Sequence, residues 1–79
     1  MRISIIIPTL NEALIIGRLL ASLQTLRQQG HELIVVDGGS CDSTVTIAEA
    51  MADHVLSSAR GRATQMNLGG RRASGDLLL

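Results

Sequence analysis

Apolar and polar positions along the chain fall into two alternating patterns. Four short aliphatic runs, at residues 3–7, 33–36, 54–57 and 76–79, have the length and composition of strands. The run at 33–36 has no polar alternation, which is typical of a central strand buried on both faces of a sheet. The segments between the runs repeat apolar residues every three or four positions, as helices do. The pattern predicts an α/β fold with a mostly parallel sheet.

The first strand and the first helix have recognisable boundaries. Pro8 has no backbone N–H and cannot continue a ladder, so we expect the strand to close after Ile7. Asn11 is a good N-cap for a helix over residues 12–29, and Gly30 is its expected C-cap. The apolar stripe of this helix is formed by Ile15, Ile16, Leu19, Leu20, Leu23 and Leu26.

Two further helices are predicted. One follows the Gly38-Gly39 turn, is capped by Asp42 or Ser43, and ends near Ala52. A weaker helical pattern covers residues 61–74, where small side chains would permit close approach to a sheet or a ligand. The residues expected to face inward are Val45, Ala48, Met51 and Ala52 on the first of these helices, and Ala63, Met66, Asn67, Gly70 and Ala73 on the second.

Length and composition restrict the class of protein. Seventy-nine residues make one small domain at most, so we treat residues 1–79 as a single partial domain with a marginal core. The apolar share of 46% contains no Phe, Tyr or Trp to stack on bases, which argues against nucleic acid as a partner. One cysteine cannot form an intramolecular disulfide, and no apolar run has the length of a membrane span. We expect a cytoplasmic location, with any membrane segment beyond Leu79.

The charges are unevenly distributed although they sum to zero. Residues 60–79 hold four arginines against one aspartate, a net charge of +3, and residues 1–59 have a net charge of −3. This asymmetry suits an anionic ligand lying between the two parts, while a solvated arginine face explains it equally well. The basic side chains are Arg60, Arg62, Arg71 and Arg72.

Polar residues follow the first two strands at the point where each strand ends. Asp37 comes directly after a buried run, and a carboxylate there can accept a hydrogen bond from a base N–H or a ribose hydroxyl. The Gly38-Gly39 pair would let the ligand come close. The alternative is that Asp37 only closes an Asx-turn. Thr9, Asn11 and Glu12 would face Asp37 across the crevice of the sheet, although each of them is also a typical helix-start residue.

Several common binding motifs are missing from the sequence. No glycine-rich fingerprint follows the first strand, and no Walker-type glycine–lysine motif occurs in this lysine-free chain, which weakens dinucleotide and P-loop interpretations. His31 and His54 have no Cys or His at ligand spacing and are interpreted as structural. Cys41 is interpreted as a small turn residue. These residues therefore predict no metal site.

Three segments together match a known family. They are Ser4-Ile-Ile-Ile-Pro-Thr-Leu-Asn-Glu12, Ile34-Val-Val-Asp-Gly-Gly-Ser-Cys-Asp-Ser-Thr44, and Asn67-Leu-Gly69 followed by Gly75-Asp76-Leu-Leu-Leu79. On these residues the chain resembles, over its whole length, the N-terminal part of inverting family 2 glycosyltransferases of the GT-A fold. The segment Gly61-Arg-Ala-Thr-Gln-Met-Asn67 is most similar to a branch of short bacterial members.

The resemblance implies the Rossmann-like, three-layer βαβ nucleotide-binding half of a GT-A domain, truncated after the start of the fourth strand. Its ligand would be a UDP-sugar or a similar donor. In such enzymes the first turn lines the uridine pocket, and the aspartate matching Asp37 contacts the uracil. Met66 stands where many members carry an arginine, so Arg62 or Arg71 would have to supply any phosphate or base contact. The implied nucleotide-binding residues are Pro8, Thr9, Asn11, Glu12, Asp37, Gly38, Gly39, Arg62, Asn67 and Arg71.

The resemblance also implies functional parts beyond Leu79. Family members place an Asp-X-Asp or related motif for Mg²⁺ or Mn²⁺ a few residues after that position, and the catalytic base and acceptor site follow later. We therefore expect the 79-residue chain alone to bind no metal and to be inactive in sugar transfer. Two alternatives stay open. One is a non-catalytic module that binds a nucleotide or forms a homo-oligomer through an exposed sheet edge beside the first strand; the other is an inactive truncated product.

Overall fold

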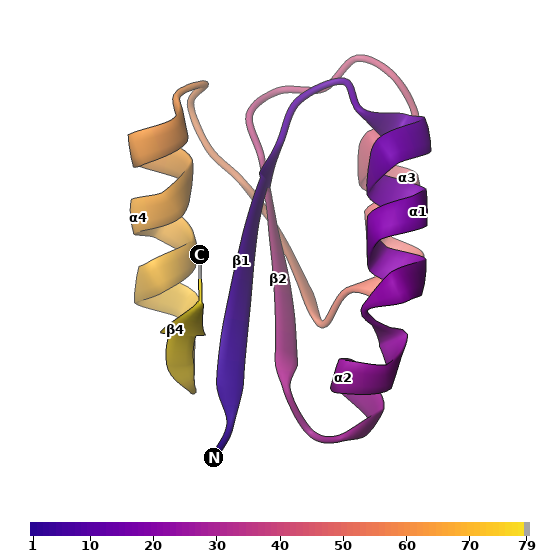
Figure 1. Cartoon of the computed structure of the whole chain (residues 1–79). Coiled ribbons are helices and arrows are strands. Elements are labelled where there is room, and N and C mark those ends of the chain that lie inside the picture. Colours follow the sequence, from indigo (N-terminus) through magenta and orange to yellow (C-terminus); the bar gives the residue numbers. More distant parts are fainter. Residues whose placement is uncertain (79) are drawn as a thin grey trace.

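A computed structural model describes residues 1–78 of the chain. Within this range four strands are connected by four helices, and the helices lie on both faces of the sheet (Figure 1). Leu79, the last residue of the fourth predicted strand, lies outside the described residues. The elements are β1 (Ile3–Thr9), α1 (Ala13–Ser22), α2 (Gln24–Gln28), β2 (Glu32–Asp37), α3 (Thr44–Met51), β3 (His54–Ser57), α4 (Arg62–Arg72) and β4 (Asp76–Leu78).

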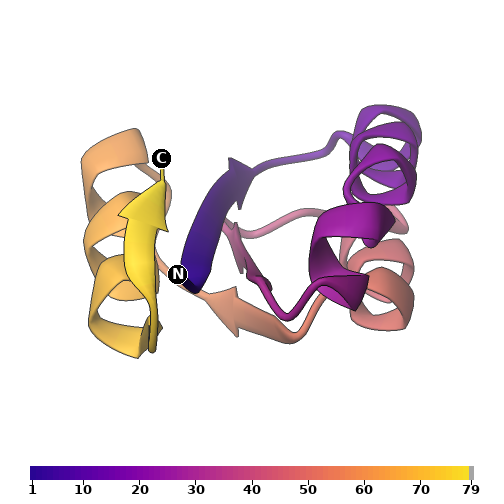
Figure 2. The same ribbon diagram turned by 60° about the horizontal axis from the view of Figure 1, so that its bottom comes forward.

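The strands form one parallel sheet in the order β3-β2-β1-β4. From β1 the chain steps outward to β2 and β3, and then crosses back to place β4 on the other side of β1. Helices α1, α2 and α3 cover one face, and α4, which makes the crossing, covers the other (Figures 1 and 2). The predicted α/β fold is therefore confirmed, and the order of the strands reverses at β1.

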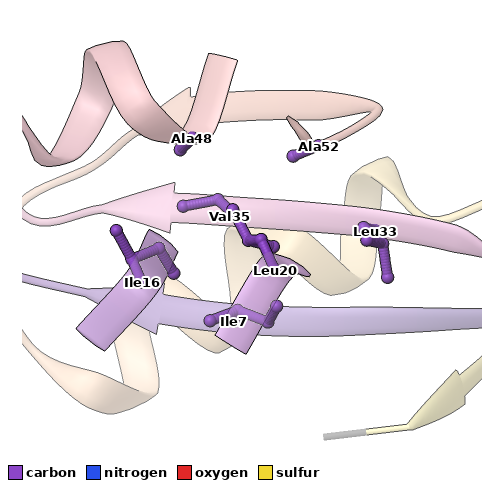
Figure 3. Close-up of a cluster of buried hydrophobic side chains, with 7 residues drawn as sticks. All are labelled: Ile7, Ile16, Leu20, Leu33, Val35, Ala48 and Ala52. Atoms are coloured by element: carbon purple, nitrogen blue, oxygen red, sulfur yellow. The ribbon is translucent and has the colours of Figure 1, made fainter. Parts of the chain in front are cut away.

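The core has two halves, one on each face of the sheet. Strand β2 is buried along its whole length, as the apolar run at 33–36 predicted. Alternate side chains of the strands point to opposite faces, so Val35 packs on the side of α1 and α3, and Val36 on the side of α4. The larger cluster, drawn in Figure 3, consists of Ile7, Ile16, Leu20, Leu33, Val35, Ala48 and Ala52.

Helix α4 packs on the sheet through a glycine. A Cβ atom added to Gly69 would lie 2.4 Å from Cγ2 of Ile6 and 3.1 Å from Cγ2 of Val36, so the helix approaches at a distance that only glycine allows. Close approach through small residues was predicted, and Met66 and Ala73 pack against the sheet as expected, but two members of the predicted face were wrong. Ala63 and Asn67 are exposed, whereas Gln65 and Gly69 are the buried positions of the helix.

The predicted end of the first strand was also wrong, because β1 continues through Pro8 to Thr9. The carbonyl of Thr9 accepts a hydrogen bond from the N–H of Gly38 (3.0 Å) and so points toward β2. Backbone groups alternate in direction along a strand, so the nitrogen of Pro8 points to the other flank. The pairing with β4 on that flank ends at Ile5 within the described residues. Pro8 therefore removes no hydrogen bond from the described ladder.

The first predicted helix is divided into α1 and α2 at Leu23, which the continuous apolar stripe did not indicate. The side chain of Gln24 compensates for the break, because its Nε2 donates to the carbonyls of Leu20 (2.9 Å) and Met51 (2.9 Å). The predicted stop at Gly30 is confirmed. Gly30 has a φ of 96°, and the N–H of His31 closes back on the carbonyl of Leu26 (3.1 Å), as in a Schellman motif.

Strand β4 occupies part of the flank of β1 that the sequence interpretation left exposed. It pairs with β1 from Ile3 to Ile5, and the N–H of Gly75 donates to Oγ of Ser4 (2.8 Å). In the part of the chain that the structure covers, the edge strands are β3 and β4. The prediction of a free sheet edge beside β1 is therefore corrected, because the crossover through α4 returns the chain to that side.

A buried carboxylate holds the amino end of the sheet together. Glu32 is 3% exposed, and its oxygens accept hydrogen bonds from Oγ of Ser4 (2.8 Å) and from the N–H of Ser74 (3.0 Å). Nε2 of His54 lies 3.2 Å away and a nitrogen of Arg2 lies 3.5 Å away. Burial tends to raise the pKa of this carboxyl, but the hydrogen bonds from Ser74 and Ser4 and the charge of Arg2 outweigh it and lower the pKa to about 2.

Between residues 1 and 78, no helix has the length and apolarity needed to cross a membrane.

Candidate nucleotide-binding site

A pocket of about 180 Å³ lies at the carboxyl end of β1, beside the first turns of α4. This is where the strand order reverses, and open parallel sheets bind ligands in the crevice at such a switch point. The volume is smaller than the roughly 300–1,000 Å³ of most small-molecule sites, so the described residues alone do not enclose a ligand of that size. The lining residues are Pro8, Thr9, Leu10, Glu12, Arg62 and Gln65.

Thr9 lines this pocket and carries a hydroxyl group that has no partner among the described residues. The residue is 4% exposed. Among the described residues, its Oγ1 is the buried side-chain nitrogen or oxygen atom that has no hydrogen-bond partner. Leaving a buried hydroxyl unpaired costs about 1–3 kcal/mol. A hydroxyl both donates and accepts, so a polar ligand atom that reached Oγ1 would remove that cost.

Two groups of opposite charge line the same pocket. Arg62 is exposed at the first position of α4, where the positive end of the helix dipole adds to its own charge. Its guanidinium has the planar donor geometry that suits phosphate oxygens. Glu12, in the loop after β1, makes no side-chain hydrogen bond to the residues that the structure describes, so its carboxylate can accept from hydroxyl or N–H groups. The pocket can thus bind a ligand that carries both anionic oxygens and hydrogen-bond donors.

The loops after β1 and β2 are bonded to each other beside the pocket. Asn11 lies at the centre of this contact with a φ of 50°, in the left-handed region that asparagine tolerates, and it is therefore not the predicted N-cap. Glu12 holds the cap position instead. The bonds run from the N–H of Asn11 to Oγ of Ser40 (2.8 Å), from the N–H of Cys41 to Oδ1 of Asn11 (2.7 Å), from the N–H of Glu12 to Oγ1 of Thr44 (2.9 Å), and from the N–H of Ala13 to Oδ2 of Asp42 (3.3 Å).

Asp37 has the Asx-turn geometry that was its alternative interpretation. Its Oδ2 accepts from the N–H groups of Gly39 (3.0 Å) and Ser40 (2.8 Å), and its Oδ1 accepts from Oγ of Ser40. A carboxylate has about four acceptor positions, so one remains for a ligand. Asp37 is 3% exposed and does not line the pocket.

The structure gathers some of the predicted site residues and separates others. Pro8, Thr9, Glu12 and Arg62 meet in the pocket, while Asn11, Gly38 and Gly39 lie in the two bonded loops beside it and Asp37 lies at the end of β2. Asn67 is exposed on α4 and does not line the pocket. Arg71 is nine residues beyond Arg62 on the same helix, about 13 Å at 1.5 Å per residue, and lies toward the amino end of the sheet.

Sequence reasoning missed two lining residues, Leu10 and Gln65. Gln65 is 5% exposed, and its amide bonds to the ends of both β1 and β2. A polar residue is not an obvious member of a buried helix face. The available signal was its spacing, because Gln65 precedes Gly69 by four residues and therefore shares the closely packed side of α4.

No group of three or more His, Cys, Asp or Glu side chains is placed for a metal ion anywhere in residues 1–78. His54 bonds to Glu32, and Nδ1 of His31 accepts from the N–H of Ile3 (3.0 Å). The carboxylates of Asp37, at the end of β2, and of Asp42, in the loop after β2, already accept hydrogen bonds from backbone N–H groups. The described residues alone therefore do not fit a divalent cation.

Comparison with known proteins gives a family match over nearly the whole chain. The family described as "Glycosyl transferase family 2" matches residues 4–79. The chain is also 44% identical over 52 residues to a protein named "PGL/p-HBAD biosynthesis glycosyltransferase" from Mycobacterium bovis (strain BCG / Pasteur 1173P2), and to one of the same name from Mycobacterium tuberculosis (strain ATCC 25177 / H37Ra). The aligned part covers 66% of this chain and 20% of each relative, so the chain spans about a fifth of their length.

Proposed function

The chain belongs to glycosyl transferase family 2, and on that premise we propose that it forms the donor-binding part of a glycosyltransferase whose donor is a nucleotide-sugar with UDP as its nucleotide. The observation that carries the proposal is the pocket at the carboxyl end of β1, which is lined by Arg62 and by Thr9, the residue with the unpaired hydroxyl. A nucleoside diphosphate has the matching chemistry, since it combines anionic oxygens with neutral polar edges.

In this proposal each pocket group has a separate role. Arg62 binds the diphosphate, because its guanidinium lies at the start of α4 and Arg71 is about 13 Å farther along the helix. The Thr9 hydroxyl bonds to a polar atom of the uridine, and Glu12 accepts from a ribose hydroxyl. Asp37, which lies beside the pocket and not in its lining, uses its remaining acceptor position for the N–H of the uracil, and Gly39, with nothing within 4 Å of an added Cβ atom, leaves room for the base.

The transfer step is assigned to other parts of the enzyme. The proposal gives the described residues neither the ligands of a divalent cation, Mg²⁺ or Mn²⁺, nor the catalytic base that deprotonates the acceptor. The relatives' role in PGL/p-HBAD biosynthesis belongs to proteins of which this chain covers 20%, so the proposal names no acceptor. Residues 1–79 are proposed to bind the donor and to orient it.

Titration calorimetry with UDP, ADP and uridine tests the proposal. We expect UDP to bind more tightly than ADP, and Mn²⁺ to leave its affinity for residues 1–79 unchanged. Thr9→Val should weaken UDP binding by about tenfold, the value of one hydrogen bond of about 1.4 kcal/mol. The same variant should not lower the stability, because it removes an unpaired buried hydroxyl. A loss of UDP affinity without a loss of stability separates a binding role of Thr9 from a purely structural one.

The matched control is Thr46→Val, the same change on the exposed side of α3. It should leave both UDP binding and stability within error of the original chain. A folded chain that binds UDP and ADP equally, or neither of them, contradicts the proposal.

A further inference from the structure

The side chain of Gln65 is the most constrained polar group in the pocket. Its Nε2 donates to the carbonyl of Val36 (2.8 Å) and to the carbonyl of Thr9 (3.1 Å), and its Oε1 accepts from the N–H of Gly61 (3.2 Å). Both amide hydrogens and one oxygen lone pair are therefore used by the protein. Gln65 lines the pocket but has no N–H left to offer a ligand.

These three bonds join three segments that are far apart in the sequence. Thr9 ends β1, Val36 is the penultimate residue of β2, and Gly61 is the N-cap of α4. Gln65 thus fastens the first turn of α4 directly to the last rung of the β1–β2 ladder. Arg62 lies within that turn, three residues before Gln65 and next to Gly61. The position of Arg62 relative to the Thr9 hydroxyl consequently depends on the Gln65 amide.

Gly38 supports the same arrangement from the other side. A Cβ atom added to Gly38 would lie 3.0 Å from Oε1, 3.1 Å from Cδ and 3.2 Å from Nε2 of Gln65. The amide group therefore packs against the backbone of the loop after β2, in space that a larger residue would take. Any displacement of this loop would be transmitted to the amide, and from there to α4.

We propose that Gln65 is a positioning residue of the nucleotide site, which holds Arg62 in register with Thr9 through its bonds to the ends of β1 and β2. This inference rests on the proposed function for its binding consequence, but its structural part stands on the three hydrogen bonds alone. It assigns Gln65 no contact with the ligand through an N–H group. The effect on the nucleotide is transmitted through Arg62.

The chain offers a matched control in Gln24. Nε2 of Gln24 also donates to two backbone carbonyls, those of Leu20 (2.9 Å) and Met51 (2.9 Å), but at the break between α1 and α2. Gln24→Met and Gln65→Met therefore remove the same kind of clamp, one away from the pocket and one beside it. A merely structural role for Gln65 would give the two variants the same phenotype.

The experiment measures UDP affinity by calorimetry, and amide hydrogen exchange by NMR, on the full chain and its variants. We expect Gln65→Met to weaken UDP binding by about tenfold and to speed exchange of the Gly61 amide, with Gln24→Met changing neither. Gln65→Met made in an Arg62→Ala background should cause less than a twofold further loss, because the two residues act in series. Gly38→Ala, which presses on the amide without removing it, should shift both readouts in the same direction by a smaller amount.

Each other outcome overturns the inference or separates it from the proposed function. Unchanged UDP affinity in Gln65→Met, equal losses in Gln24→Met, or fully additive losses with Arg62→Ala would each overturn it. If the unmodified chain binds no UDP, the proposed function fails. In that case slow hydrogen exchange of the Gly61 amide in Gln65→Met overturns the positioning role as well. Fast exchange of the same amide supports the structural part of the inference. If Gln65→Met does not fold, Gly38→Ala decides by the same two readouts, and wild-type values in it overturn the inference.

Discussion

The buried carboxylate of Glu32 should make the stability of this chain fall steeply in acid. The pKa of this carboxyl is lowered from 4.5 to about 2 in the folded state, chiefly because hydrogen bonds from Ser74 and Ser4 and the charge of Arg2 outweigh the opposing effect of burial. A carboxyl whose pKa is lowered by folding stabilises the folded state at pH values above its unfolded pKa. That stabilisation is lost as the pH falls from about 4.5 through about 2.

The magnitude follows from the size of the shift. Each pKa unit corresponds to about 1.4 kcal/mol, so the gap between 4.5 and about 2 is worth about 3 kcal/mol at neutral pH. Glu32 is 3% exposed, so solvent screens this interaction little. Domains are typically stable by only about 5–15 kcal/mol, and a chain of this length belongs at the lower end. Protonation of the Glu32 side chain alone would therefore remove a large share of the free energy of unfolding.

Urea unfolding between pH 7 and pH 2 measures the effect. Far-UV circular dichroism is the suitable signal, because the chain has no Trp, Tyr or Phe for fluorescence. We expect Glu32→Gln to be about 3 kcal/mol less stable than the original chain at pH 7, and the difference to shrink toward zero near pH 2. Glu49→Gln, the same change on the exposed side of α3, should stay within about 0.5 kcal/mol throughout. A constant difference for Glu32→Gln across this range would refute the reasoning.

Three further predictions concern the backbone and are tested by the same unfolding assay. Gly69→Ala should lower the free energy of unfolding by about 1–3 kcal/mol, because its Cβ would lie 2.4 Å from Cγ2 of Ile6. Its control, Gly17→Ala, has its nearest contact at 3.4 Å and should raise the free energy of unfolding by up to about 1 kcal/mol. Equal effects would argue against the close packing of α4. Gly30→Ala should cost about 1–2 kcal/mol through its φ of 96° alone, since nothing lies within 4 Å of the added atom, and no loss would count against that conformation. Asn11→Ala should lower the free energy of unfolding by about 1–2 kcal/mol and speed hydrogen exchange of the Cys41 amide. Asn11→Gly should speed this exchange equally but lose less stability. Unchanged exchange in both variants would exclude the bond to Oδ1 of Asn11.

The architecture could be predicted because it depends on local patterns. The unbroken apolar run at 33–36 is sufficient to indicate a strand covered on both faces, and the structure buries every residue of β2. Gly30 ends its helix for a reason that is visible in the sequence, since only glycine adopts a φ of 96° without strain. The division of the first helix at Leu23 depends instead on the carbonyl of Met51, which becomes a neighbour of Gln24 only after folding.

The chemistry of the loops was harder to predict, because side chains can be used by the protein itself. Asn11 and Asp37 have the types and positions expected of ligand-binding residues, yet their oxygens accept from the backbone of residues 39–41. A single sequence cannot distinguish a side-chain oxygen that is free to bind a ligand from one that accepts a hydrogen bond within a turn. Thr9 differs from them because its hydroxyl has no partner in the described structure, and that difference is visible only in three dimensions.

The pocket depends on the crossover, and this explains why part of its lining was missed. Pro8 and Thr9 end β1 and Glu12 follows it, and the three were found together because they are neighbours in the sequence. Arg62 and Gln65 reach the same place from the opposite face of the sheet, only because α4 carries the chain back across β1. The approach of that helix is set by Gly69 and its rotation by the bonds of Gln65, neither of which a periodicity of apolar residues can report. Gln65 therefore both aligns α4 and lines the pocket, so changes at this helix face should alter ligand binding as well as stability.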